Sequence, residues 1–119
     1  MGEKEEYFRE LILTLKKLKR VKIEKIPTVI ENLTKTNVKG IEDLAFNILK
    51  GQIPLPDSLR EKASANKDLY KQLTAKKTPI AERRQLLQNN PRFTRSLALI
   101  GLEALDTEDV ENTLPSPVM

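Results

Sequence analysis

Hydrophobic residues recur every three or four positions along most of the chain, which is the period of an amphipathic helix. The first run extends from Tyr7 to Leu18, with acidic residues near its start and basic residues at its end, as the helix dipole favours. A run from Ile41 to Lys50 is the most apolar, and Gly51 suits the left-handed residue that ends a helix. We expect this second run to form the centre of the fold.

Capping residues predict where further helices begin. Thr28 with Glu31 fits a capping box, in which a hydroxyl and a carboxylate bond to backbone N–H groups at the start of a helix. Ser58 with Glu61 fits a second capping box. The apolar residues that follow it predict one continuous helix up to about Leu73.

Prolines and polar residues predict where helices stop. Residues 34–40 are expected to form a break, and residues 53–56 cannot continue a helix because their two prolines lack N–H donors. Thr78 followed by Pro79 predicts the start of another helix, and a last helix is expected to end near Leu105. No alternating pattern typical of strands is present. The sequence therefore predicts an all-α protein, a compact bundle of five or six short helices.

Charge is distributed unevenly along the chain. The formal net charge is +4, yet residues 57–95 carry ten basic and four acidic groups, whereas residues 96–119 carry five acidic groups and no basic one. Acidity and prolines after Leu105 predict a single helical domain at residues 1–105 and a disordered acidic tail at residues 106–119. A basic body with an acidic tail favours an anionic partner and a contact between tail and body.

The composition argues against catalysis. The chain contains no Cys and no His, which excludes thiol nucleophiles, imidazole bases and the usual zinc or copper ligands. Adjacent carboxylates such as Glu42 and Asp43 would point to different sides of a helix, so they suit neither a metal ion nor an acid–base pair. We expect a non-enzymatic protein without cofactor or metal. Charges interrupt its apolar runs, so we also expect no signal peptide, no membrane span and an intracellular location.

Two groups of basic residues are the candidate sites for an anionic partner. They lie at the end of the first helix and around the turn at Thr78, and the alternative is that both only keep the surface solvated. Without a zinc finger, a helix-turn-helix consensus or an aromatic stacking motif, any contact with nucleic acid should involve phosphates. The first group comprises Lys16, Lys17, Lys19, Arg20 and Lys22, and the second centres on Lys76, Lys77, Arg83 and Arg84, with Lys67, Lys71, Arg92 and Arg95 around it.

Two short motifs in the middle of the chain carry a resemblance. They are AFNILKGQIPL at residues 45–55 and, after a lysine-containing helix, RRQLL at residues 83–87. Over residues 41–95 the chain resembles a family of short basic proteins that Maverick/Polinton elements and adintovirus-like viruses encode beside capsid genes. The resemblance implies a virion-associated or genome-associated protein that contacts nucleic-acid phosphates or the capsid interior. It also implies a location in the cytoplasm or nucleus of a host cell, or in a virion.

A second class of function stays open. The number of helices and the moderate net charge also suit a helical protein–protein adaptor, with a six-helix arrangement like that of death-fold modules. Salt separates the two classes, because phosphate binding weakens steeply as salt rises and an apolar helix–groove contact barely responds. The choice between DNA and RNA, a capsid-protein partner and a homo-oligomer stay open as well.

Overall fold

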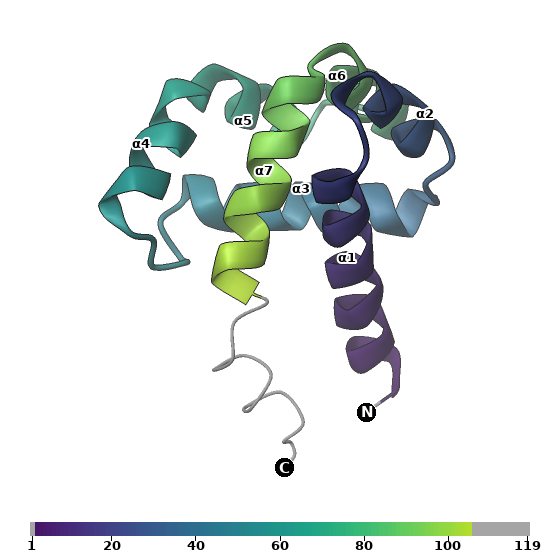
Figure 1. The fold of residues 1–119 in the computed structure, drawn as a ribbon, viewed down its shortest axis with the longest axis horizontal. Coiled ribbons are helices and arrows are strands. Elements are labelled where there is room, and N and C mark those ends of the chain that lie inside the picture. Colours follow the sequence, from purple (N-terminus) through teal and green to yellow (C-terminus); the bar gives the residue numbers. More distant parts are fainter. Residues whose placement is uncertain (1, 106–119) are drawn as a thin grey trace.

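The chain folds into a bundle of helices, and the computed structural model describes residues 2–105 of it (Figure 1). The all-α class is confirmed, since the described residues form seven α-helices, one short 3-10 helix and no strand. None of these helices is long and apolar enough to cross a membrane. The elements are α1 (Gly2–Arg20), η1 (Ile23–Lys25), α2 (Ile26–Glu31), α3 (Lys35–Leu49), α4 (Asp57–Ala65), α5 (Lys67–Thr74), α6 (Ile80–Asn89) and α7 (Pro91–Leu105).

The predicted number of helices is too low because the helix expected from Ser58 to Leu73 is two helices. Asn66 divides it, with backbone angles φ −111° and ψ 24°, and its side-chain amide donates to the carbonyl of Lys62. An amide that bonds to a nearby carbonyl competes with the helical pattern and favours such a break. After the division α5 places Tyr70 in the core, whereas α4 has no buried residue. The tail expected at residues 106–119 lies outside the described residues.

Prolines open three helices for which hydroxyl caps were expected. α2 has a proline in its first turn, α4 and α6 have one at the N-cap, and none of the three has a side-chain cap. Thr28 and Ser58 lie inside helices, so both predicted capping boxes are wrong. Thr78 does not cap α6 either, and its hydroxyl donates to the carbonyl of Gln72 at 3.0 Å. Proline suits these positions because its fixed φ fits the helix and its missing N–H would have no partner there.

The central helix, α3, starts earlier than predicted. Thr34, expected within a break, is its N-cap, and the Thr34 hydroxyl accepts a hydrogen bond from the backbone N–H of Asn37 at 3.1 Å. Val38 is fully buried, so the apolar face of α3 begins before Ile41. The predicted end is confirmed, because Gly51 has a φ of 71° in the left-handed region.

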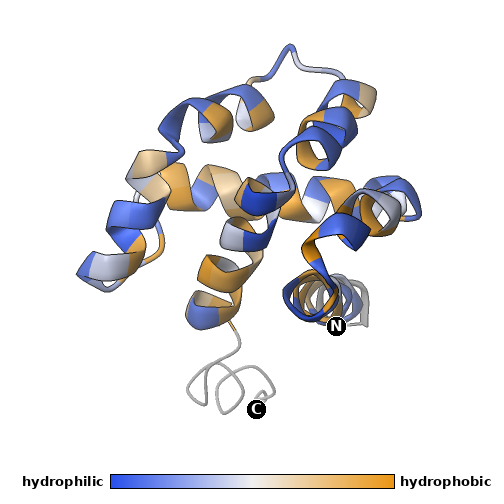
Figure 2. Cartoon of the chain, turned by 45° about the horizontal axis from the view of Figure 1, so that its top comes forward, coloured by the Kyte–Doolittle hydropathy of each residue, from blue (hydrophilic) through white to orange (hydrophobic). Residues whose placement is uncertain are grey.

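The core lies where α3 meets the other long helices, as predicted. Ile41, Leu44 and Ile48 of α3 are buried, and Figure 2 shows hydrophobic residues of the helices turned toward the interior of the bundle. Tyr70 is also a core residue and meets Phe93 edge to face, with ring centroids 5.3 Å apart. Burial raises the pKa of Tyr70 to about 12, so its hydroxyl stays neutral inside the core.

The last helix, α7, passes very close to α1 and α3 at Gly101. A β-carbon at this position would lie 2.4 Å from Cδ2 of Leu44 and 3.1 Å from Cδ1 of Leu15. The sequence predicts only that Gly101 weakens the helix, by about 1 kcal/mol relative to alanine. The structure shows that its missing side chain is what lets α7 lie against both helices. α1 and α7 therefore lie side by side, and α4 packs on another side of α7 (Figure 1).

Candidate anion-binding interface

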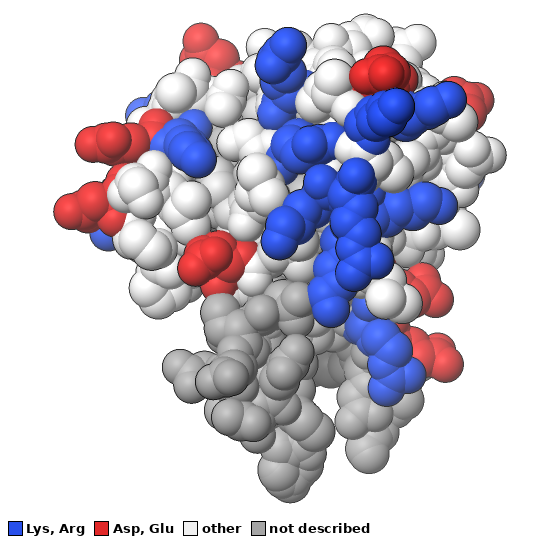
Figure 3. Space-filling view, viewed as in Figure 1, with Lys and Arg blue, Asp and Glu red and all other residues white. Residues whose placement is uncertain are grey.

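Basic side chains gather on one face of the molecule, over the C-terminal part of α1 and the neighbouring part of α7 (Figure 3). Two adjoining hollows of about 450 and 410 Å³ lie on this face and share Leu59 and Leu99. Together they form a single depression along the outer side of α7, between α1 and α4, which we call the α7 groove. The residues that line it come from α1, η1, α4 and α7, so the groove exists only in the folded chain.

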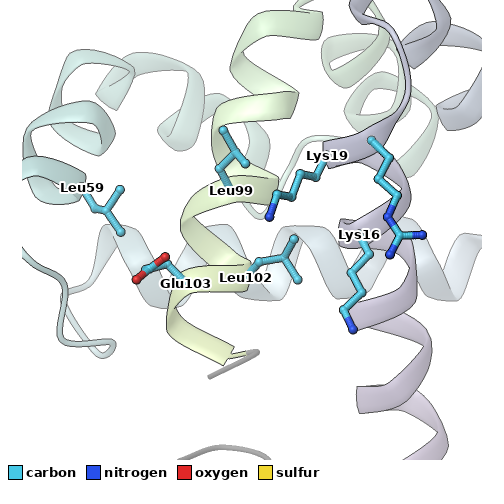
Figure 4. A pocket seen from close by; sticks show the side chains of 7 residues that line it. Lys16, Lys19, Leu59, Leu99, Leu102 and Glu103 are labelled. Atoms are coloured by element: carbon cyan, nitrogen blue, oxygen red, sulfur yellow. The ribbon is translucent and has the colours of Figure 1, made fainter. Parts of the chain in front are cut away.

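The floor of the α7 groove is apolar. Leu99 lies on the outer side of α7, and Leu59 comes toward it from α4 (Figure 4). Leu102 of α7 also lines the groove but is buried. Leu99 is 37% exposed, which makes it one of the most exposed large hydrophobic residues in the described chain. Leu13 and Phe46 are more exposed, but neither lines the α7 groove, so Leu99 is the exposed apolar residue that this face offers to another group.

The rim of the α7 groove is basic. Lys16, Lys19 and Arg20 occupy one side of α1 because residues three and four apart share a helix face, and Figure 4 shows Lys19 extended toward α7. Only one carboxylate, that of Glu103, is among the residues that line the groove. The six cations of the rim are Lys16, Lys19, Arg20, Lys62, Arg92 and Arg95.

Arg95 joins the two helices that border the groove. Its guanidinium donates a hydrogen bond to the carbonyl of Val21, directly after the end of α1. The carbonyls at a helix end have no partner within the helix, so this bond satisfies one of the acceptors that α1 leaves there. Arg95 is half-buried and adds positive charge at the edge of the groove while it fixes the distance between α1 and α7.

The structure brings only part of the first predicted group to the groove. Lys16, Lys19 and Arg20 line it, whereas Lys17 and Lys22 are exposed but are not among its lining residues. Their positions on α1 and just after it turn them away from the face that meets α7. Lys62 is not among the predicted site residues, because only the packing of α4 against α7 brings it to the rim.

Arg83, in the second predicted group, is buried and serves the fold. Its guanidinium lies 2.9 Å from the Glu42 carboxylate and donates to the carbonyl of Ala75, also at 2.9 Å. The Arg83 side chain is 11% exposed, and that of Glu42 is 12% exposed. A guanidinium that turned toward an external phosphate would leave the buried Glu42 carboxylate with only the exposed ammonium of Lys39, 3.9 Å away, so Arg83 is not available to an external anion.

Arg84 is also engaged within the chain. Its guanidinium donates to the carbonyls of Ile30 and Leu33, both at 2.8 Å, at the end of α2. Lys76 and Lys77 are exposed in the turn before α6 and do not line the groove. The four residues expected to form one anion-binding face are thus divided between the interior and a solvated turn.

Within residues 2–105 no group of three acidic, Cys or His side chains is placed to hold a metal ion. Comparisons of the chain with family models, with characterised proteins and with solved structures found no match. The resemblance to the Maverick/Polinton family stays a prediction from the residues, and the function is inferred from the α7 groove.

Proposed function

We propose that this protein is a non-catalytic binding protein that contacts nucleic-acid phosphates through the α7 groove. The observation that carries the proposal is the convergence of six cations from α1, α4 and α7 around one groove that contains a single carboxylate. Cations that neutralise phosphates release condensed counterions, and this release drives binding that does not depend on sequence. Three helices must fold together to create this convergence, so it is not a property of one basic segment.

The floor of the groove indicates how a nucleic acid would be held. Leu59, Leu99 and Leu102 offer neither an aromatic ring for base stacking nor a hydrogen-bonding group for base edges. Contacts would be made by the rim to the sugar–phosphate backbone. We therefore propose binding without sequence preference and with a strong dependence on salt.

The biological setting of the proposal comes from the sequence. The resemblance over residues 41–95 favours a protein of a virus-like element that associates with its genome or with the interior of its capsid. A capsid interior that presents acidic side chains would meet the same rim as a phosphate backbone does. The groove supports an anionic partner, and the resemblance supports a virion as the place where the two meet.

The exposed leucines favour a second candidate, a helical adaptor that binds a protein partner. Leu59 and Leu99 would accept the apolar side of a partner helix in the groove. The described chain has seven α-helices and not six, so this candidate rests on the groove and not on the helix arrangement of death-fold modules. A partner held by leucines alone would dissociate little as salt rises.

The test is a titration with a fluorescent, non-specific DNA duplex at several salt concentrations. The groove variant combines Lys19→Gln, Lys62→Gln and Arg92→Gln, and the control variant combines Lys76→Gln, Lys77→Gln and Arg9→Gln. Both remove two lysines and one arginine that are exposed. We expect the groove variant to lower affinity and to reduce the slope of log affinity against log salt by about 2–3, while the control changes the slope little.

Two results would contradict the proposal. Equal losses in the groove and control variants would mean that only net charge matters and that the groove has no special role. A parent protein that does not bind duplex or single-stranded nucleic acid at low salt would exclude the nucleic-acid function and leave the adaptor.

A further inference from the structure

The apolar floor of the α7 groove is not explained by a phosphate backbone. Leu59 and Leu99 would face a polar surface if nucleic acid were the only occupant, whereas Leu102 is already buried. A peptide that carries both carboxylates and aliphatic side chains would satisfy the basic rim and the leucines together. The chain contains such a peptide, residues 106–119, directly after α7.

We infer that residues 106–119 bind the α7 groove of their own chain and compete there with nucleic acid. The competition rests on the proposed function, whereas the binding of the segment does not. The proposed ligand of the α7 groove is thus an acidic segment with spaced aliphatic residues.

The acidic segment is close enough to reach the whole groove. It follows Leu105, and Leu102 of the floor lies in the last turn of α7. Leu99 lies about 9 Å before the end of the helix at 1.5 Å per residue. The segment can span about 45 Å when extended, so a turn after α7 and a few further residues bring it back to Leu99 and Leu59.

The charges of the segment and the groove are complementary. The first half of the segment contains four carboxylates, and the chain has no basic residue after Arg95. Exposed ion pairs contribute little one at a time. The short connection to α7 compensates for this, because it keeps the segment at an effective concentration in the millimolar range. We expect weak, salt-sensitive and reversible binding, which is what a competitor of nucleic acid requires.

The aliphatic residues of the segment match the floor. Val110 and Leu114 are four positions apart and follow the carboxylates. Contacts of these two side chains with Leu59 and Leu99 would remove apolar surface from water on both sides. A purely acidic segment would gain nothing from the leucines, so the combination of charge and apolar residues favours this segment over a simple counter-charge.

The experiment uses the full chain, which contains no cysteine of its own, so an introduced cysteine is the single site of labelling. Asn112→Cys gives one attachment point for a nitroxide, whose unpaired electron broadens the NMR signals of nearby amides. At low salt and without nucleic acid, we expect strong broadening at Lys19, Leu59 and Leu99 and little at Phe46, which lies on α3 outside the groove. The broadening at Lys19 and Leu59 should disappear at high salt.

A matched pair of variants separates the segment from net charge. The tail variant combines Glu108→Gln, Asp109→Asn and Glu111→Gln. The control variant combines Glu61→Gln, Asp68→Asn and Glu82→Gln, which are exposed and outside the groove. Only the tail variant should lose the broadening at Lys19 and Leu59. If the segment occupies the groove about nine-tenths of the time, the tail variant should bind duplex about tenfold more tightly than the control does.

The possible failures are distinguishable. Unchanged broadening in the tail variant, together with equal duplex affinities of the two variants, would overturn the inference and leave the proposed function intact. Broadening that arises only between labelled and unlabelled chains would overturn binding within one chain. Specific, salt-sensitive broadening without any nucleic-acid binding would support the docking and overturn the proposed function.

Discussion

Two pairs of neighbouring basic residues, Arg83–Arg84 and Lys19–Arg20, have similar sequences and opposite environments. On α6 both arginines turn toward acceptors of the protein itself, namely Glu42 and the carbonyls at the end of α2. On α1 both cations are exposed at the rim of the groove, and neither has a hydrogen-bonded or ion-paired partner within residues 2–105. The acceptors within reach therefore decide whether a basic pair stabilises the fold or stays available to a partner.

The packing of the two helices explains the difference. α6 lies against α2 and α3, whose free carbonyls and buried carboxylate need donors. The end of α1 lies against α7, where Arg95 already donates to the carbonyl of Val21. Lys19 and Arg20 therefore have no internal acceptor to satisfy and remain available to an external anion. Substitutions at the two pairs test this contrast.

The largest effect should come from Arg83→Met. Loss of the guanidinium leaves the buried Glu42 carboxylate with only the exposed ammonium of Lys39, 3.9 Å away, so we expect the free energy of unfolding to fall by about 3 kcal/mol. Urea denaturation followed by circular dichroism measures it. The double variant with Glu42→Leu should recover at least half of the loss, because no charge is then left alone. A loss below about 0.5 kcal/mol in the single variant, a size typical of surface sites, would contradict a structural role for Arg83.

Arg84→Met should have a smaller effect of the same kind. The carbonyls of Ile30 and Leu33 would lose a charged donor, although both bonds are only partly buried and water can replace part of them. We expect a loss of about 1–2 kcal/mol in the same urea assay. Arg84→Lys serves as a comparison and should recover only part of the loss, since a lysine cannot fork between two carbonyls. Equal stability of the methionine variant and the parent would mean that these bonds do not hold α6 to α2.

The smallest effect on stability should come from the pair on α1. The double variant Lys19→Gln, Arg20→Gln should change the free energy of unfolding by less than about 0.5 kcal/mol, because exposed charges without partners contribute little to stability. The same variant should weaken duplex binding. A loss of stability above that of Arg84→Met would show that the groove cations hold the fold, and the contrast between the two pairs would disappear.

The sequence predicts the parts of the fold that depend on local chemistry. Spacing of apolar residues predicts α3 as the core, and the left-handed preference of glycine predicts its end at Gly51. The start of α3 was missed because Thr34 looked like a loop residue, although a hydroxyl three positions before an N–H donor is also a cap. The division at Asn66 was missed because residues on both sides keep the helical period.

The site was predicted only in part, because it depends on contacts between distant segments. Local spacing puts Lys16, Lys19 and Arg20 on one face of a helix, and this much is visible in the sequence. The burial of Arg83 depends on Glu42, a residue 41 positions earlier in the chain. The position of Lys62 depends in the same way on the packing of α4 against α7. The partners lie far apart in the sequence, and no local pattern connects them.

The close packing of α7 on α1 at Gly101 also has a consequence for biosynthesis. α1 leaves the ribosome first, and its partner follows only after residues 21–90 have been made. Until then the cations of α1 are present without the leucines of α7, and the apolar side of α1 has only α3 to pack against among the helices that it contacts most. The α7 groove therefore forms only after α7 has been made, so a chain interrupted before Gly101 carries much of the positive charge of the site but cannot offer its shape.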